Sequence, residues 1–160
     1  AKINEIVAGY GYEKLIYPSN LGLDLSKINA SEKICFDKEV ESLRKEVFHS
    51  EFSIINASCG VSSHGVVCVI SSKEQPRMLS LAPTLCIILL KKEQIVRSMS
   101  EAFALVKKEA QTAKSSNALN SNKTLPNNIL FIAGPSRTAD IELITVFGVH
   151  GSQKVHLVLY

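Results

Sequence analysis

Residues 79–90, LSLAPTLCIILL, form the longest apolar stretch of this 160-residue chain and limit most strongly what the chain can fold into. A transmembrane helix needs about 20 apolar residues, so this shorter stretch, interrupted by Pro83, does not qualify as one. Residues 84–90 are apolar at successive positions, as expected for a strand buried on both faces. The pattern therefore predicts a central strand of a covered, parallel sheet.

Other segments alternate between strand and helix patterns. Strands are predicted at residues 52–58, 65–71, 129–134 and 154–160, which are bounded by Gly, Ser or polar residues. Residues 93–110 carry an apolar stripe at helical spacing, formed by Ile95, Met99, Ala102, Phe103, Val106 and Ala110. Shorter helices are predicted at residues 36–48, with Asp37 as the cap, and at residues 138–147. This alternation predicts an α/β fold with a largely parallel sheet.

Composition and length describe one globular domain over residues 1–160, with 46% hydrophobic and 21% charged residues. Residues 112–128 are polar and rich in Ser and Asn, so they are predicted to be a loop within that domain. The net charge of +3 comes from scattered lysines, which does not favour a nucleic-acid partner. Neither a signal peptide nor a membrane span is visible, and a cytoplasmic location is expected.

The cysteines indicate thiols rather than a metal centre. Cys35, Cys59, Cys68 and Cys86 form no CxxC or CxxxC pair, so the spacing typical of zinc and iron–sulfur ligands is missing. Four free thiols are expected, with no metal or cofactor on this chain. Cys59 and His64 are an alternative nucleophile and base, but no oxyanion-hole signature accompanies them. Neither GxxxxGK[ST] nor GxGxxG is present, so nucleotide chemistry is poorly supported.

Residues 131–142, FIAGPSRTADIE, form a corner directly after a predicted strand. Gly134 gives the backbone conformational freedom there, and Pro135 fixes the direction of the turn. Ser136 or Thr138 can cap the helix that is predicted to follow. The N–H groups of the first turn of that helix would then be available to a carboxylate or a phosphate.

The charged residues at the same corner allow two interpretations. Arg137 suits an anionic ligand. Asp140 and Glu142 already complement the dipole of the predicted helix, although they can also hold Arg137 or accept hydrogen bonds from ligand hydroxyls. The spacing alone therefore leaves two alternatives, an anion site or a capped strand-to-helix turn.

Residues 134–142 resemble the C-terminal signature of the LUD-domain family, in the lactate utilisation protein C group. The family pattern is Gly-Pro-Ser-Arg-Thr-Ala-Asp-Ile-Glu, and a later Gly-Val-His-Gly is matched by residues 148–151. Residues 59–71 and 74–103 resemble further segments of the family. The resemblance covers residues 52 to 160, whereas the first 50 residues match loosely. The longer N-terminal helical arm of the family is expected to be lost or shortened here.

The resemblance implies a fold of the NagB/RpiA/CoA-transferase-like class, with Rossmann-like layers, whose members bind anionic ligands at the carboxyl edge of the sheet. It also implies membership in a cytoplasmic complex that oxidises L-lactate to pyruvate. In that complex, iron–sulfur clusters belong to partner proteins and this chain is a non-redox subunit with no assigned catalytic residue. Two alternatives are a stand-alone enzyme of the CoA-transferase or formyltetrahydrofolate cyclo-ligase kind and a diverged structural member.

The resemblance also selects candidate ligand-binding residues. Ser63 stands where the family often has an acid, and the neighbouring His64 can replace it, because the unperturbed pKa of histidine is near neutrality. Arg77 is a second possible anion ligand, and His156 is expected on the polar face of the last strand. The full candidate set is Gly134, Pro135, Ser136, Arg137, Thr138, Asp140, Glu142, His150, Gly151, Gly65, His64 and Arg77.

Overall fold

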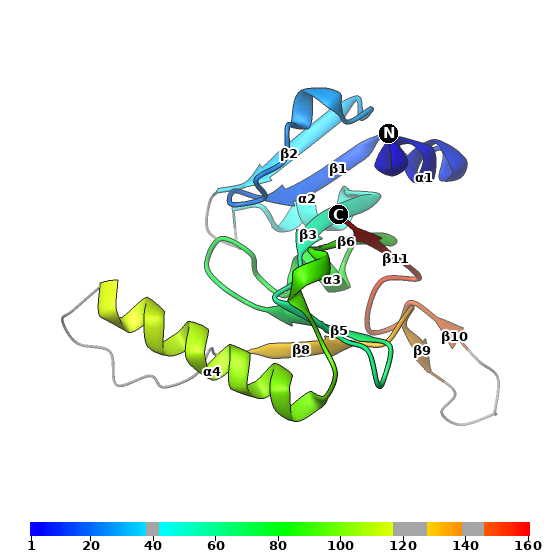
Figure 1. The fold of residues 1–160 in the computed structure, drawn as a ribbon. Helices are drawn as coiled ribbons and strands as arrows, with labels where there is room; N and C mark the ends of the chain where they lie inside the picture. The colour runs from blue at the N-terminus through cyan, green and yellow to red at the C-terminus, as the bar shows by residue number, and fades with distance from the viewer. Residues whose placement is uncertain (38–41, 117–127, 139–145) are drawn as a thin grey trace.

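The computed structural model describes residues 1–37, 42–116, 128–138 and 146–160 (Figure 1). Its larger sheet has five strands, all parallel, in the order β11-β6-β3-β1-β2. These strands are β1 (Lys14–Pro18), β2 (Glu32–Phe36), β3 (Phe52–Asn56), β6 (Leu85–Leu90) and β11 (Lys154–Leu159).

Strand β6 confirms the prediction of a central, buried strand. It lies between β3 and β11, and all of its residues are buried. One face of the sheet is covered by α1 (Lys2–Tyr10) and by the short 3-10 helix η1 (Leu25–Lys27), which pack near Leu85, Ile87 and Leu89. The other face packs against α2 (Arg44–His49), α3 (Met78–Leu81) and a second sheet. Both faces of β6 therefore need apolar side chains.

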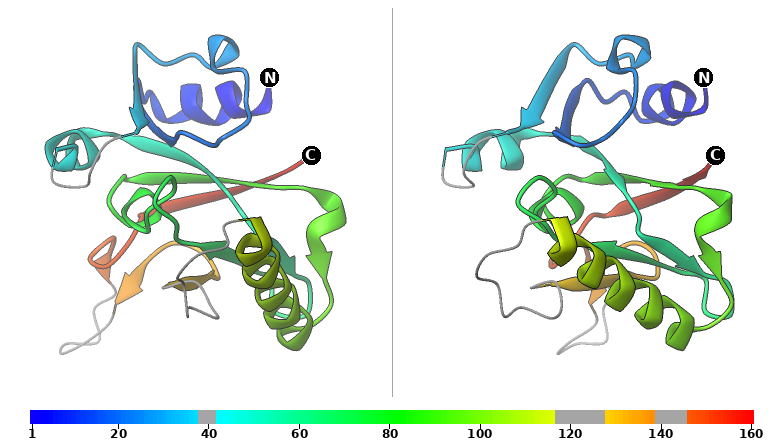
Figure 2. Two further views of the ribbon diagram at one scale, coloured as in Figure 1. Left: turned by 90° about the vertical axis from the view of Figure 1, so that its left-hand side faces the viewer. Right: turned by 60° about the vertical axis from the view of Figure 1, so that its left-hand side comes forward.

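The second sheet lies beneath the first and is mixed rather than parallel (Figures 1 and 2). Its order is β7-β4-β5-β8, in which β5 runs antiparallel to both β4 and β8, while β4 and β7 are parallel. The strands are β4 (Cys59–Val61), β5 (Val66–Ile70), β7 (Ile95–Val96) and β8 (Ile129–Ile132). Helix α4 (Met99–Ser116) packs on this sheet through Ala102 and Val106. The prediction of a largely parallel sheet holds for the five-stranded sheet.

Helix α4 begins six residues later than the sequence pattern predicts. Lys92–Gln94 form a 3-10 turn, and Ile95 pairs with Gly60 as part of β7. Gly60 permits this close approach, because a Cβ atom there would lie 2.6 Å from the Leu90 side chain. The helix start carries a recognisable signal, since the Glu101 N–H donates to Ser98 Oγ and the Glu101 carboxylate accepts from the Arg97 N–H.

The helix predicted over residues 36–48 is also shorter than expected. Phe36 ends β2, and helix α2 begins at Arg44 with Leu43 as its N-cap. Asp37 therefore does not cap this helix. Residues 38–41 of this predicted helix lie outside the described residues, as do residues 117–127 of the predicted polar loop. Residues 112–116 of that loop belong to α4.

The N-terminal helix is tied to the last strand by an aromatic cluster. The Tyr10 hydroxyl lies 2.9 Å from His156 Nε2, and Lys154 Nζ lies 4.1 Å from the centre of the Tyr10 ring. Lys154 Nζ also donates to the Tyr12 hydroxyl at 3.1 Å. His156 therefore faces α1 and is half-buried rather than standing on an open polar face. Among the described helices, none has the length and apolar character needed to cross a membrane.

Candidate ligand-binding site

The corner after Gly134 is not the start of a helix. Arg137–Thr138 form β9 and Val146–Phe147 form β10, and these two short strands pair antiparallel in a ribbon that projects from the body (Figure 1). The predicted helix is therefore wrong at both of its ends, because β-branched and aromatic residues pair across the ribbon instead. Ser136 lies in the turn before β9 and Thr138 lies in β9, so no helix begins at the described part of this corner. Asp140 and Glu142 lie outside the described residues.

A pocket of about 380 Å³ lies beside this corner. It is bounded by the end of α3, by β8 and by the loop before β11. Four of the predicted site residues, Gly134, Ser136, His150 and Gly151, line it. The other lining residues are Ser80, Leu81, Leu130, Phe131, Ile132, Ala133, Ser152 and Val155.

Backbone contacts join the two sequence segments that match the family pattern. The Ser136 N–H donates to the Ser152 carbonyl at 2.9 Å, and the Ser136 carbonyl accepts from the Gly148 N–H at 3.1 Å. Gly148 adopts a φ of 77°, which favours glycine. A Cβ atom on Gly151 would lie 3.3 Å from Ser136 Cβ, so only a very small residue fits there without displacing its neighbour. The two motifs therefore build one wall of the pocket.

Ser152 is the residue of this site that sequence reasoning missed. Its side chain is buried, and its hydroxyl lies 2.7 Å from the Pro83 carbonyl oxygen and 3.1 Å from that of Ser80. The single hydroxyl hydrogen can donate to either oxygen, and the Pro83 oxygen is the nearer of the two. These oxygens lie at the end of α3 and in the turn that follows it. Ser152 thereby fixes the loop before β11 against α3. Its partners lie about 70 positions earlier in the chain, so no local signal could have identified it.

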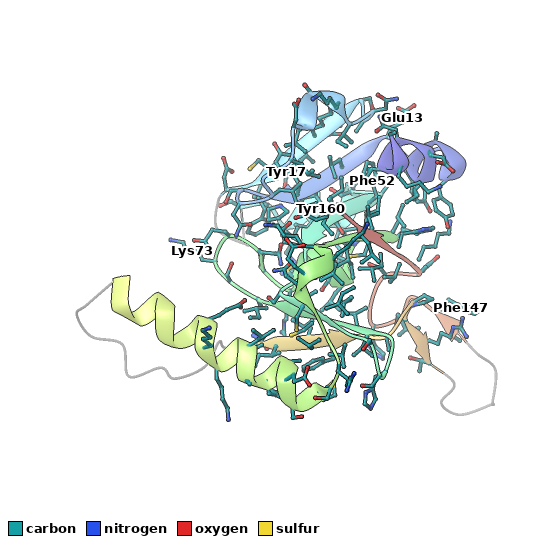
Figure 3. The ribbon with its side chains drawn as sticks, in the orientation of Figure 1. Glu13, Tyr17, Phe52, Lys73, Phe147 and Tyr160 are labelled. Atoms are coloured by element: carbon teal, nitrogen blue, oxygen red, sulfur yellow. The ribbon has the colours of Figure 1, made fainter. Side chains whose placement is uncertain are left out.

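Neither candidate arginine lines the pocket. The Arg137 guanidinium lies 5.4 Å from the centre of the Phe147 ring, a cation–π contact on the projecting ribbon, where Figure 3 shows Phe147. Arg77 is exposed at the start of α3, and its backbone N–H donates to Ser71 Oγ. Thr138 also belongs to the ribbon. Among the described residues that line the pocket, His150 is the only one with an ionisable side chain.

His64 and Gly65 form the turn between β4 and β5, outside the pocket lining. The Ser63 hydroxyl lies 2.7 Å from His64 Nδ1, and Gly65 has a φ of 61°. Because Val67 pairs with Ile132, this turn lies next to the carboxyl end of β8. Pro135 is half-buried at that end but does not line the pocket.

The pocket lies at the amino edge of the five-stranded sheet, because α3 precedes β6 and Ser152 precedes β11. The resemblance implies anion binding at the carboxyl edge. Gly134 does follow the carboxyl end of a strand, but that strand is β8 of the second sheet. The corner after Gly134 therefore does not lie at the carboxyl edge of the five-stranded sheet, where the resemblance implies anion binding.

Burial argues against a nucleophilic cysteine. Cys59 and Cys68 are paired across β4 and β5 beneath α4, and neither is exposed to solvent. Burial raises the pKa of the Cys59 thiol and raises the pKa of Cys68 to about 12. Cys86 in β6 is also fully buried, and burial raises its pKa to about 12. The thiolate form that attacks electrophiles is therefore scarce at neutral pH.

Thiol labelling should distinguish these positions. The four cysteines are free, and only Cys35 is partly exposed. At pH 8 we expect one thiol per chain to react quickly with a disulfide reagent such as DTNB, and the other three to react only after unfolding. Cys35→Ser should remove the fast phase. Fast reaction of two or more thiols in the folded protein would contradict the buried positions.

The described residues contain no group of three or more His, Cys, Asp or Glu side chains placed to hold a metal ion. The arrangement offers a different chemistry. His150 can donate a hydrogen bond or carry a positive charge, and the hydroxyl of Ser136 lies on the same wall. Apolar side chains from α3, β8 and β11 line the pocket as well, together with the serines at positions 80 and 152. Such a pocket suits a small, partly apolar ligand that bears a hydrogen-bond acceptor.

Comparisons with known proteins agree with the sequence pattern. The chain is 32% identical over 123 residues to "Lactate utilization protein C" of Bacillus subtilis strain 168, covering 77% of this chain and 47% of that protein. It is 33% identical over 111 residues to the protein YkgG of Escherichia coli strain K12, covering 69% of this chain and 44% of that protein. The chain thus spans about half the length of these curated relatives.

The fold also has a counterpart among solved structures. A crystal structure of a duf162 family protein from Deinococcus radiodurans matches with a TM-score of 0.60 at 16% identity, over 99% of this chain and 82% of that chain. The model of the LUD domain matches residues 9–160. The match therefore includes most of the first 50 residues, in which the sequence motifs are only loosely recognisable. The chain belongs to the LUD domain family.

Proposed function

We propose that this chain is a lactate utilisation protein that acts as the non-redox subunit of a cytoplasmic complex oxidising L-lactate to pyruvate. The proposal rests on its family and on relatives named Lactate utilization protein C. In this proposal, the iron–sulfur clusters that carry the electrons belong to partner proteins. The chain itself binds a small carboxylate.

One observation carries the ligand-binding part of the proposal. The two segments that match the family pattern bring Ser136, His150 and Gly151 to one pocket. A protonated His150 can neutralise a carboxylate, and the Ser136 hydroxyl can bond to a hydroxyl or keto oxygen on the adjacent carbon. L-lactate and pyruvate both carry this pair of groups. Apolar residues of β8 can accommodate their methyl group.

A growth experiment tests the proposed role. Deleting the gene in its native host should abolish growth on L-lactate, and the wild-type gene should restore it. His150→Gln should restore growth poorly, because the side chain can no longer carry a positive charge. His49→Gln, an exposed histidine on α2 outside the pocket, should restore growth fully. Unchanged growth on L-lactate after the deletion would contradict the proposal.

A purification experiment tests the proposed partners. A tagged chain isolated from native cells grown on L-lactate should bring down cysteine-rich proteins, and iron analysis should detect their clusters. Mass spectrometry identifies these proteins, and a tag on an unrelated protein is the control. Recovery of a single, iron-free chain would contradict the subunit role and would favour the stand-alone ligand-binding enzyme.

A further inference from the structure

Strand β11 forms one edge of the five-stranded sheet, because β6 is the only described strand that pairs with it. Its six residues, Lys154–Leu159, follow β6 in a continuous parallel register and include neither a proline nor an acidic residue. Natural edge strands are commonly short, bent or charged, which prevents them from pairing with another chain. The opposite edge, β2, carries Glu32 and Lys33 in this way, whereas β11 is long and largely apolar.

Alternate residues of β11 point their backbone groups away from β6. The N–H groups of Lys154 and Tyr160 donate toward β6, to the carbonyls of residues 84 and 90, at 3.0 Å and 3.2 Å. The direction of these groups alternates along a strand, so the even-numbered residues of β11 bond to β6. The residues whose N–H and C=O groups point to the free edge are Val155, Leu157 and Leu159.

A groove of about 420 Å³ lies along this free edge. It is bounded by α1, which contributes Lys2, Glu5 and Ile6, and by residues 156–159 of β11. Successive strand residues point to opposite faces of a sheet, so a groove lined by four of them in a row follows the edge of the strand. Since β6 occupies the other edge of β11, the free backbone groups are open to an extended chain.

The side chains beside the free edge are apolar and exposed. Leu157 and Leu159 are each 46% exposed, and Tyr160 is 55% exposed. The two leucines point to the same face of the sheet as Ile88 and Leu90, which are buried in the core. The core therefore ends at β11 in a row of side chains that still contacts water. A further strand beside β11 would cover this row, which stabilises the pairing.

We propose that β11 pairs with β11 of a second copy of the chain, antiparallel and about a two-fold axis at Leu157. In this register Leu157 lies opposite its own copy, and Val155 lies opposite Leu159. These pairs join the free backbone groups, and each pair exchanges two hydrogen bonds. A register centred on residue 156 or 158 leaves one of the three residues without a partner in the strand. The five-stranded sheet then continues through both copies.

The side chains support a second copy as the occupant. On the face that carries the exposed leucines, every pair in this register is apolar. On the other face, His156 lies opposite Val158. Lys154 lies opposite Tyr160, whose aromatic ring attracts a cation. Like charges directly opposite each other would be destabilising, and this register contains none. The edge is thus self-complementary, as a two-fold interface requires, and it is independent of the lactate role proposed above.

Sedimentation of the purified chain over a range of concentrations tests the dimer. A single strand pair and its flanks form a small interface, so we expect half-dissociation at about 10 µM. Leu157→Lys places two ammonium groups opposite each other and should remain monomeric up to about 200 µM. Phe48→Lys, at an exposed apolar position on α2, is the control and should dimerise like the wild type. A wild-type chain that is monomeric at about 500 µM, or a dimer that Leu157→Lys leaves intact, would overturn the proposal.

Cysteine crosslinking tests the register, in a Cys35→Ser background that removes the partly exposed thiol. The Cα atoms of residue 157 and its copy should lie about 5.5 Å apart, within the reach of a disulfide. Leu157→Cys should therefore form a covalent dimer on mild oxidation. Leu159→Cys should not, because its copy lies about 13 Å further along the strand. Equal crosslinking through both positions, or crosslinking through neither, would overturn the proposed pairing.

Discussion

Ile88→Ala is expected to lower the free energy of unfolding by about 4 kcal/mol, the largest single effect predicted for this chain. Ile88 has no exposed surface and lies in β6, the strand between β3 and β11. Its side chain packs with Ile16, Ile55 and Val69, so truncation leaves a cavity between the two sheets. Urea unfolding followed by circular dichroism measures the change.

Leu157→Ala is the matched control for this experiment. Leu157 pairs with Ile88 in the neighbouring strand, but its side chain is 46% exposed. Its truncation removes less buried surface and should cost about 1 kcal/mol or less. Equal costs for the two variants would contradict the position of β6 at the centre of the sheet.

Strand β6 could be predicted from the sequence because it is buried on both faces. Strands that are exposed on one side or at an edge could not. Residues 84–90 are apolar throughout, and this pattern has few alternatives. Strands β1 and β2 were not predicted, since β1 ends in a proline and β2 is an exposed edge that begins with Glu32 and Lys33. Their parallel pairing with each other joins segments whose register no local pattern encodes. Nearly half of the larger sheet was therefore missed.

Ser152→Ala is expected to lower the free energy of unfolding by about 2 kcal/mol, the second largest effect. The variant leaves the carbonyl oxygens of Ser80 and Pro83 without the hydroxyl that now donates to them. The loop before β11 should loosen, and exchange of the Ser136 amide hydrogen, which is bonded to the Ser152 carbonyl, should accelerate. Denaturant unfolding and amide hydrogen exchange measure the two effects.

Ser31→Ala is the control for the loss of a serine hydroxyl. Ser31 also donates a side-chain hydrogen bond, to Glu13, but it lies at the surface, where water replaces the bond. Its removal should cost about 0.5 kcal/mol or less. If Ser152→Ala is no more costly than Ser31→Ala and leaves the Ser136 exchange rate unchanged, Ser152 does not hold the pocket wall.

The candidate site was predictable in its membership rather than in its geometry. The family motifs selected Ser136, His150 and Gly151, which the structure brings to one pocket. The helix predicted over residues 138–147 was wrong at its two described ends, where β9 and β10 pair as strands. Arg137 consequently contacts Phe147 rather than the pocket. Ser152 could not be found, since its role depends on contacts with α3 that exist only in the folded chain.

We propose that the pocket beside Ser136 and His150 binds a small carboxylate. A titration of the isotope-labelled chain with L-lactate and with pyruvate tests it most directly, by following backbone amide signals. We expect saturable changes at Ser136, His150 and Gly151 that disappear in His150→Gln. The changes should persist in Lys91→Gln, because Lys91 is exposed and does not line this pocket. Spectra that do not change at saturating concentrations of either acid, or that change equally in His150→Gln, would contradict it.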